Sequence, residues 1–572
     1  MNIKRIIGAS ALLTTFTLTG CSDDGVVEGD AGTESETSDT DDSDSGDGDG
    51  DDPATASGDG DGDDPTDDPT VGDGDGDDPT DDPSDDPTDE STAGDGDGDP
   101  TGDGDGDPMP DPGGRVRVMH GSPDAPPVDI YIEGVDDPVI SGLAYAQTSG
   151  FLPVPEGEYN FQVYVAGAEP IADNLVIETG AVMIGLDTDY TVLARGLLAP
   201  EMGEGEFGLE LYVDGFEAVA PGTVRARLVH AGADAPTVDL DVYDANAEAP
   251  CSGPREIPDF ARFTDTGDTG VELPAVDGIN VAVCAGNVAA RTFTLDIAAL
   301  DGAELYVFAD GLLAQNVGRA FDAFQLLAIG PDTAGDAISI RRDPLFYLLH
   351  AVPDVGEVNV CLEGAGLQLG GVPFTGFAGE FSLPPNVTRE FFLDPVGMGP
   401  PCGDNIPFPI DGSSLTRGDT HVVVVAGSVG LDNLSQQIYT DGTALDDPDN
   451  LRVQAVHMSP DTPEVDVGAE GAGFGVWTDL AYPDASDPEG VSLPPDTYTI
   501  QAGVSMAQGE DADAAAVSFG PLNLEGAAGA RVMAFVGGLL APGFNGSPLT
   551  LMLVGPTDQG DYGWSLTAVP AN

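Results

Sequence analysis

Lysine is almost missing from this chain. Its 572 residues include 17 Lys and Arg against 103 Asp and Glu, which gives a formal net charge of -86 at pH 7. Because Lys4 is the only lysine, Schiff-base and Ser–Lys chemistry have no candidate residue in the body of the chain. A surface this acidic repels phosphate backbones, since nucleic-acid affinity comes largely from basic groups that displace counterions. We therefore expect no nucleic-acid partner.

Long hydrophobic runs are also scarce. The N-terminal stretch MNIKRIIGASALLTTFTLTGC has a basic start and an apolar segment that suits a secretory signal better than a membrane span. Its end, Leu18 to Cys21, resembles the lipobox of bacterial lipoprotein signal peptides. The resemblance implies that residues 1–20 are removed and that Cys21 is lipidated, and Ser22 after it favours the outer membrane. The alternative is an ordinary signal peptide that happens to contain a cysteine.

Basic and apolar residues are both lacking in the next segment. Residues 22–113 hold 37 of the 103 acidic residues and no Lys, Arg or His. Such a composition cannot bury enough apolar surface to offset the entropy of ordering, so we expect residues 21–113 to form a disordered, extended linker behind the lipid anchor. The run from Asp59 mimics the start of an EF-hand loop, but Asp64 and Thr70 stand where that loop needs Gly and Glu. Only weak, non-specific Ca²⁺ association is expected there.

Helical periodicity is not evident beyond residue 113, where the chain instead repeats two β-like phrases. The first, VRVMHGSPDAPPVDIYIEG, starts at Val116 and recurs from Val224, Phe346 and Leu451. The second starts at Tyr190 (YTVLARGLLAP), Leu305, His421 and Arg531. Their alternation of apolar and polar residues, broken at Gly, Pro and Asp, predicts short antiparallel strands.

The repeat length predicts an all-β fold of four tandem, immunoglobulin-like β-sandwich domains. We place these domains at residues 114–222, 223–343, 344–450 and 451–572. We expect them to be strung out as separate beads.

The first phrase resembles the start of the DUF4397 domain, which occurs in bacterial cell-surface proteins and lipoproteins, often in tandem. The residues that carry the likeness follow the pattern V-x-x-x-H-x-S-P-D-A-P-x-V-D-[IVL]-Y-[IV]. The resemblance extends to all four repeats and implies a tandem architecture at the cell surface, with no catalytic residue to assign. The third repeat departs most, because Gly356 replaces a Pro and Asn359 replaces the second Asp.

Each repeat carries a histidine followed by one or two aspartates. Structurally, the histidine would end a strand, the first aspartate would accept backbone N–H groups in the turn, and neither would need a ligand. Alternatively, the set could bind a divalent ion, or Ser122 or Ser459 could serve as a nucleophile, although Gly232 and Val352 stand at that position in the other repeats. The structural interpretation is favoured, and we expect no resident metal or cofactor. The residues are His120, Asp124, Asp129, His230, Asp234, Asp239, His350, Asp354, His457, Asp461 and Asp466.

Cysteine and tryptophan are rare. The four cysteines after Cys21 fall in pairs within the second and third repeats, so in an exported chain we expect the disulfides Cys251–Cys284 and Cys361–Cys402. A Cys₄ zinc site would need CxxC-like spacing, which this sequence does not have. Trp477 and Trp564 could stack on a sugar, although packing is the simpler interpretation. The RGD tripeptide at residues 417–419 is best explained by chance in a chain rich in Gly and Asp.

These features together predict a non-enzymatic lipoprotein, anchored in the outer membrane of the bacterial envelope and exposed at the cell surface. Its domains would serve adhesion or envelope interaction through a surface protein or a glycan. A binding module for a small ligand, glycan or divalent cation is the alternative, and a metal-dependent hydrolase is the remote one.

Overall fold

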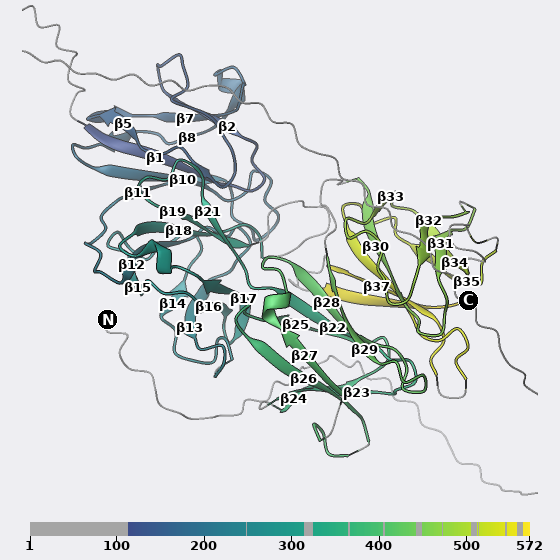
Figure 1. The fold of residues 1–572 in the computed structure, drawn as a ribbon. Helices are drawn as coiled ribbons and strands as arrows, with labels where there is room; N and C mark the ends of the chain where they lie inside the picture. The colour runs from purple at the N-terminus through teal and green to yellow at the C-terminus, as the bar shows by residue number, and fades with distance from the viewer. Residues whose placement is uncertain are drawn as a thin grey trace, which may run out of the picture. The chain divides into compact units, whose positions relative to one another are not determined.

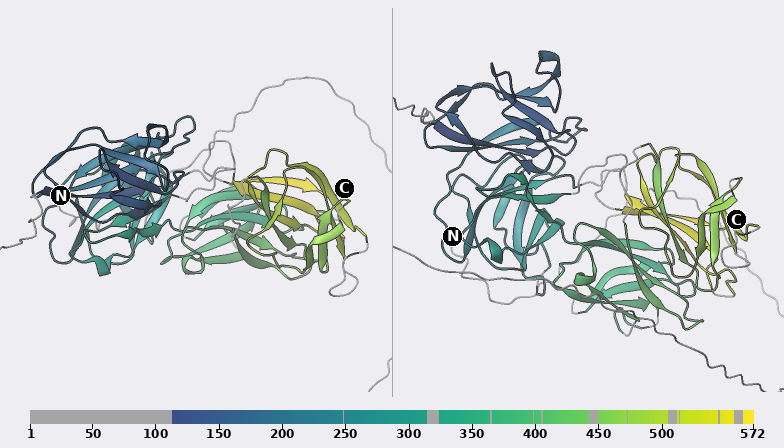
Figure 2. Two further views of the ribbon diagram at one scale, coloured as in Figure 1. Left: turned by 90° about the horizontal axis from the view of Figure 1, so that it is seen from above. Right: turned by 45° about the horizontal axis from the view of Figure 1, so that its top comes forward.

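The computed structural model describes residues 113–247, 249–313, 324–363, 366–397, 399–403, 406–441, 449–471, 473–504, 512, 514–543, 546–556 and 564–572. The predicted signal peptide, the lipidation of Cys21 and the linker up to residue 112 lie outside these residues. The described chain is all-β, with 38 strands and three short 3₁₀ turns (Figures 1 and 2). None of its helical segments has the length and apolar character of a membrane span.

Most of the described strands form four pairs of facing sheets, which we call sandwiches 1 to 4. In sandwich 1 a sheet of order β11-β10-β1-β4, with β5 also beside β1, faces the sheet β3-β2-β7-β8, while β6 and β9 form a small separate ribbon. Its elements are β1 (Gly113–Gly121), β2 (Val128–Ile132), β3 (Ile140–Leu143), β4 (Gln147–Thr148), β5 (Leu152–Pro155), β6 (Gly157–Tyr159), β7 (Phe161–Val165), η1 (Ala172–Asn174), β8 (Leu175–Glu178), β9 (Val182–Ile184), β10 (Asp189–Arg195) and β11 (Gly208–Val213).

Sandwich 2 has the sheets β15-β12-β18-β19-β21 and β14-β13-β16-β17, while its β20 pairs with β4 of sandwich 1. Its elements are β12 (Thr223–His230), β13 (Val238–Tyr243), β14 (Ile257–Phe260), β15 (Val271–Pro274), β16 (Ile279–Ala285), β17 (Val288–Leu295), η2 (Ala298–Leu300), β18 (Glu304–Asp310), β19 (Gln325–Ile329), β20 (Gly335–Asp336) and β21 (Ile338–Arg341).

Sandwich 3 has the sheets β25-β22-β28-β29 and β24-β23-β26-β27. Its elements are β22 (Leu345–Ala351), β23 (Val358–Leu362), β24 (Gly366–Val372), β25 (Phe377–Ser382), β26 (Thr388–Pro395), β27 (Ile406–Asp411), η3 (Gly412–Ser414), β28 (Thr420–Ala426) and β29 (Ser435–Thr440).

Sandwich 4 has the sheets β33-β30-β36-β37-β38 and β32-β31-β34-β35. Its elements are β30 (Leu451–Met458), β31 (Val465–Ala469), β32 (Gly473–Leu480), β33 (Val491–Leu493), β34 (Thr497–Val504), β35 (Val517–Asn523), β36 (Arg531–Gly537), β37 (Thr550–Pro556) and β38 (Trp564–Pro570).

The two repeated phrases lie side by side in every sandwich. The first-phrase strand pairs with the second-phrase strand in parallel, as β1 with β10, β12 with β18, β22 with β28 and β30 with β36. The prediction of antiparallel strands was therefore wrong for this central pair, although the other strand pairs of the described sheets are antiparallel. Alternation along one strand sets which face is buried but not the direction of its neighbour.

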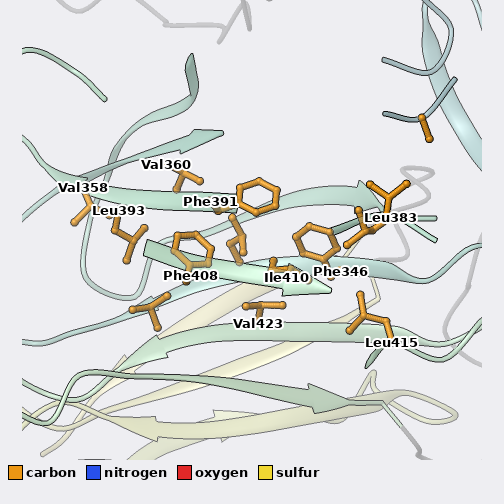
Figure 3. Close-up of a cluster of buried hydrophobic side chains, with 14 of the residues drawn as sticks. Phe346, Val358, Val360, Leu383, Phe391, Leu393, Phe408, Ile410, Leu415 and Val423 are labelled. Atoms are coloured by element: carbon orange, nitrogen blue, oxygen red, sulfur yellow. The ribbon is translucent and has the colours of Figure 1, made fainter. Parts of the chain in front are cut away.

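The central sheets are apolar on both faces. In β22 and β28, Phe346 and Val423 point into the interior of sandwich 3, where aromatic rings fill the space between the sheets (Figure 3). Their neighbours Tyr347, Leu349 and Val424 point the other way and join a second cluster with residues of β30 and β36. Sandwiches 3 and 4 therefore share a buried apolar interface.

An equivalent cluster joins sandwiches 1 and 2, where Met119 and Leu193 meet Val229, Tyr306 and Phe308. The expectation of separate beads is corrected by these shared interfaces. The physical reason is visible in runs such as LFYLL (345–349) and VVVVA (422–426), which are continuously apolar and so typical of strands covered on both faces.

Sandwich 2 and sandwich 3 each contain one internal disulfide. Cys251 is bonded to Cys284 and Cys361 to Cys402, which confirms the predicted pairing.

Candidate functional site

The histidine of each repeat ends the first-phrase strand and folds over the turn that follows. Its Nε2 lies 3.3 Å from the carbonyl oxygen of Pro126 at His120, and 2.9 Å from that of Pro236 at His230. The same contact is made by His350 with Gly356 O at 3.0 Å and by His457 with Pro463 O at 3.2 Å. A carbonyl can only accept, so Nε2 carries the proton in each case.

In three of these histidines the other ring nitrogen also accepts a hydrogen bond within the turn, whereas Nδ1 of His230 has no partner among the described residues. Nδ1 accepts the backbone N–H two residues on, at 3.4 Å in His120 and His350 and at 3.2 Å in His457. All four imidazoles are buried, at 1–3% exposure, and burial lowers their pKa below the ordinary value. The rings are therefore neutral hydrogen-bonding elements of the turn.

The first aspartate joins the two repeated phrases. Both oxygens of Asp124 accept backbone N–H groups of the loop after β10, from Leu198 and Ala199 at 2.8 Å each. Asp461 does the same with Leu540 at 2.8 Å and Ala541 at 3.0 Å.

The other two sandwiches keep this contact. Asp234 accepts from Leu313 N at 2.8 Å, and Asp354 from Val429 N at 3.0 Å and Gly430 N at 2.7 Å. For Asp354, partial burial opposes ionisation, but the N–H groups of Gly430 and Val429 and the Ser428 hydroxyl outweigh it and lower the pKa.

The second aspartate holds a bulge in the neighbouring edge strand. Asp129 accepts Gly142 N at 2.7 Å and Gly167 N at 2.8 Å, and Asp466 accepts Asp479 N at 2.8 Å and Ala512 N at 2.7 Å.

The donors in the edge strand have left-handed backbone conformations at register shifts. Their φ values are 63° at Gly142, 53° at Asp259, 66° at Gly371 and 53° at Asp479. A bulge leaves a backbone N–H without a ladder partner, and this side chain accepts it. Asp239 accepts Asp259 N at 2.8 Å, and Asn359 accepts Gly371 N at 3.2 Å, so the Asn of the third repeat keeps that bond.

The histidine and the second aspartate lie on opposite sheets of each sandwich, on β1 and β2 in sandwich 1. Among the described residues, the group of His, Cys, Asp and Glu ligand atoms close enough to share a metal is Asp241, Cys251 and Cys284, and its two sulfurs form the disulfide. A metal at a histidine turn would have to displace backbone groups from the carboxylates. The structure therefore places all the repeated residues in backbone-supporting positions.

The serine considered as a nucleophile is likewise engaged. Ser122 is fully buried and its hydroxyl donates to Gly196 O at 2.7 Å, while the hydroxyl of the equally buried Ser459 lies 2.5 Å from that of Thr462. In the RGD tripeptide, Arg417 pairs with Asp296 at 2.8 Å.

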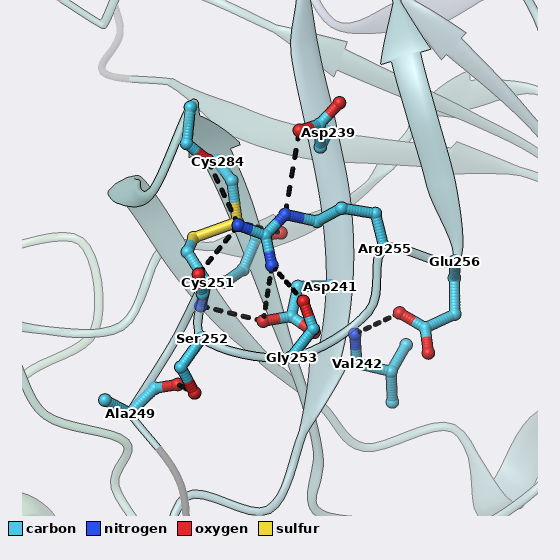
Figure 4. The surroundings of a disulfide bond; sticks show 12 residues. Asp239, Asp241, Val242, Ala249, Cys251, Ser252, Gly253, Arg255, Glu256 and Cys284 are labelled. Atoms are coloured by element: carbon cyan, nitrogen blue, oxygen red, sulfur yellow. Dashed lines mark hydrogen bonds and ion pairs between the residues drawn. A yellow bond between two sulfur atoms is a disulfide. The ribbon is translucent and has the colours of Figure 1, made fainter. Parts of the chain in front are cut away.

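The Cys251–Cys284 disulfide lies beside an arginine (Figure 4). Arg255 donates to the carbonyl oxygens of Cys251 at 2.7 Å and Gly286 at 3.0 Å, and its guanidinium lies 3.6 Å from Asp239 and from Asp241. Asp241, which is 2% exposed, also accepts the N–H of Cys251 at 2.7 Å. The cluster ties the cysteine loop to β13 and β16, a role that spacing alone did not reveal.

An apolar cavity of about 60 Å³ lies between the sheets of sandwich 4. It is lined by residues of β30, β31, β34, β36 and β37, and Trp477 of β32 forms part of its wall. Trp477 is 7% exposed, so it does not form a surface platform for sugars. Of Trp564 the structure gives the backbone, at the start of β38.

Two segments of the chain, residues 114–241 and 345–468, match the family described as Domain of unknown function (DUF4397). Each match begins at a first-phrase strand and ends within the second strand of the following sandwich. No curated protein matches the chain.

Proposed function

We propose that this chain is a non-enzymatic lipoprotein of the bacterial cell surface, in which four DUF4397 repeats are displayed at the end of an acidic linker for adhesion or envelope interaction. One observation carries the proposal. The residues of the repeated motif that could perform chemistry, His120, Asp124 and Asp129 and their equivalents, are bound to backbone groups of their own sandwich. The motif repeats because each sandwich needs it to fold.

The lipid anchor rests on the sequence. Labelling of cells with radioactive palmitate should mark the parent chain and should not mark a Cys21→Ala variant. Equal labelling of the two would overturn the anchor.

Display and adhesion can be tested on the same strains. An antibody against sandwich 4 should bind intact cells that carry the parent chain, and deletion of the gene should reduce attachment of those cells to a host-cell or glycan-coated surface. Antibody binding only after the envelope is broken would place the chain inside it. Unchanged attachment of the deletion strain would contradict an adhesive role.

A small-ligand binding module is the second candidate. The cavity of sandwich 4 is the observation that favours it.

A further inference from the structure

The cavity of sandwich 4 arises at positions where the other sandwiches have larger side chains. Two positions before the motif histidine, β30 has Ala455, which pairs with Ala534 of β36. The corresponding pairs are Val118 with Val192, Leu228 with Val307 and Leu348 with Val423 in sandwiches 1 to 3. Both alanines line the cavity.

The facing sheet of sandwich 4 also has a smaller pair of side chains at the cavity than the other sandwiches have. Val467 of β31 pairs with Ala502 of β34, and both line the cavity. The corresponding pairs are Ile130 with Val163, Leu240 with Val283 and Val360 with Leu393. Three alanines on two opposed sheets therefore line the same cavity. The cavity results from several small residues and not from a single packing defect.

The comparison with sandwich 3 shows how the same space is otherwise filled. Phe346 and Phe391, whose rings are 5.8 Å apart, occupy the interior there (Figure 3). Sandwich 4 has Val453 and Ile500 at these two positions, as the registers of β22 with β28 and of β23 with β26 show. Protein interiors are close-packed, so an apolar space of this kind is costly unless something occupies it.

Trp477, in the wall of the cavity, carries a polar group that has no partner among the described residues. The Nε1 of Trp477 is buried and finds no hydrogen-bond acceptor among the described residues. A buried indole N–H usually has a partner, because an unmatched buried donor costs free energy. The polar residues at the turn end of the cavity, His457 and Ser459, are already bonded to Pro463 and Thr462. A ligand in this cavity would therefore need one acceptor oxygen for the Trp477 indole N–H, and the rest of the molecule would be hydrocarbon.

We propose that the interior of sandwich 4 binds a neutral, unbranched aliphatic molecule whose single hydroxyl or carbonyl oxygen accepts the Trp477 indole N–H. The cavity has room for roughly four to five groups of the size of a water or a methylene. Its walls are aliphatic apart from Trp477 and Tyr498 and the residues of the histidine turn. A negatively charged head group is disfavoured by the net charge of -86. This inference does not depend on the surface role proposed above.

The test uses the full chain with Cys21→Ala, which can be handled without detergent, and a series of n-alkanols from methanol to octanol. Because the sequence has two tryptophans, a Trp564→Phe variant assigns the indole N–H signal of Trp477 in NMR spectra. We expect this signal to shift saturably. The affinity should rise about fourfold per methylene, as expected for burying each CH₂, until the alcohol has roughly five non-hydrogen atoms, and should not rise further for longer alcohols. Butanoate should bind more weakly than butanol.

Filling the cavity should abolish binding. Ala455→Leu introduces the residue that sandwiches 2 and 3 carry there, and Ala502→Val is an independent filling variant; each should weaken butanol binding at least tenfold. Ala515→Leu, the same chemical change at an exposed site of sandwich 4, should leave the affinity unchanged. A shift that grows linearly without saturation, or equal affinity in the filled and parent chains, would overturn the proposal.

Discussion

All five histidines of the chain are buried, and burial lowers the pKa of each, to about 4 for His421. In the unfolded chain each should titrate at ~6.5. Between that value and the lower folded values the unfolded chain binds more protons, so the free energy of unfolding decreases as the pH falls below ~6.5.

We therefore expect no imidazole of the folded chain to titrate at the ordinary pKa of histidine. NMR of the ring C–H signals should show them nearly constant between pH 7.5 and 6.5, and the thermal midpoint should drop from pH 6.5 to 5, above the range of ordinary carboxylates. A histidine signal that titrates at the free-imidazole value would contradict the buried turns.

Substitution of the second aspartate tests how much its hydrogen bonds to the bulge stabilise a sandwich. Asp466 is fully buried and accepts backbone N–H groups of Asp479 and Ala512. Asp466→Ala removes the acceptor of the buried Ala512 N–H and of the partly buried Asp479 N–H, and should cost about 2–6 kcal/mol of unfolding free energy, at ~1–3 for each group. Asp466→Asn should cost less, because its oxygen still accepts one N–H, as Asn359 does in sandwich 3. Urea unfolding of the two variants measures the difference, and equal losses would show that the hydrogen bonds are not the cause.

At the scale of elements, each disulfide closes a loop within one sandwich. Cys251–Cys284 and Cys361–Cys402 close loops of 33 and 41 residues, which corresponds to about 4 kcal/mol each in the chain-entropy treatment. We expect a Cys251→Ser/Cys284→Ser double variant to lower the unfolding midpoint of sandwich 2 and to leave that of sandwich 4 unchanged. Calorimetry under oxidising conditions, with the parent chain under reductant as a comparison, checks this. A loss shared equally by sandwich 4 would show a global effect and not a local crosslink.

Sequence patterns predicted the strands and the disulfides because both depend on local information. Alternation of apolar and polar residues in VDIYI marks a strand, and pairs of cysteines within one repeat can meet. The role of Asp124 could not be predicted, because its partners Leu198 and Ala199 become neighbours only once β1 and β10 pair in parallel. The bulge partner of the second aspartate could not be predicted either, because a register shift in the edge strand produces no periodic pattern in the sequence.

At the scale of the whole chain, continuous apolar strands explain why the sandwiches are not separate. The outer face of β36 and β37 buries Met533, Phe535 and Met552 against Tyr347 and Tyr439 of sandwich 3. Phe535 is fully buried, and its ring lies 5.7 Å from that of Tyr439 in an edge-to-face arrangement. Burial of this kind couples the stability of the two sandwiches, because neither can expose its outer face without cost.

Phe535→Ala should therefore separate two unfolding events that are joined in the parent chain. Removing a buried phenylalanine costs about 3–5 kcal/mol, and here the loss falls on the interface as well as on sandwich 4. In calorimetry we expect the shared transition of sandwiches 3 and 4 to split, with sandwich 4 unfolding first. Val429→Ala, at a side chain 52% exposed on sandwich 3, is the matched control and should leave the transition intact. If the parent chain already shows independent transitions for the two sandwiches, the apolar cluster between them does not couple their folding, and the bead-like organisation first expected from the sequence would describe the chain better.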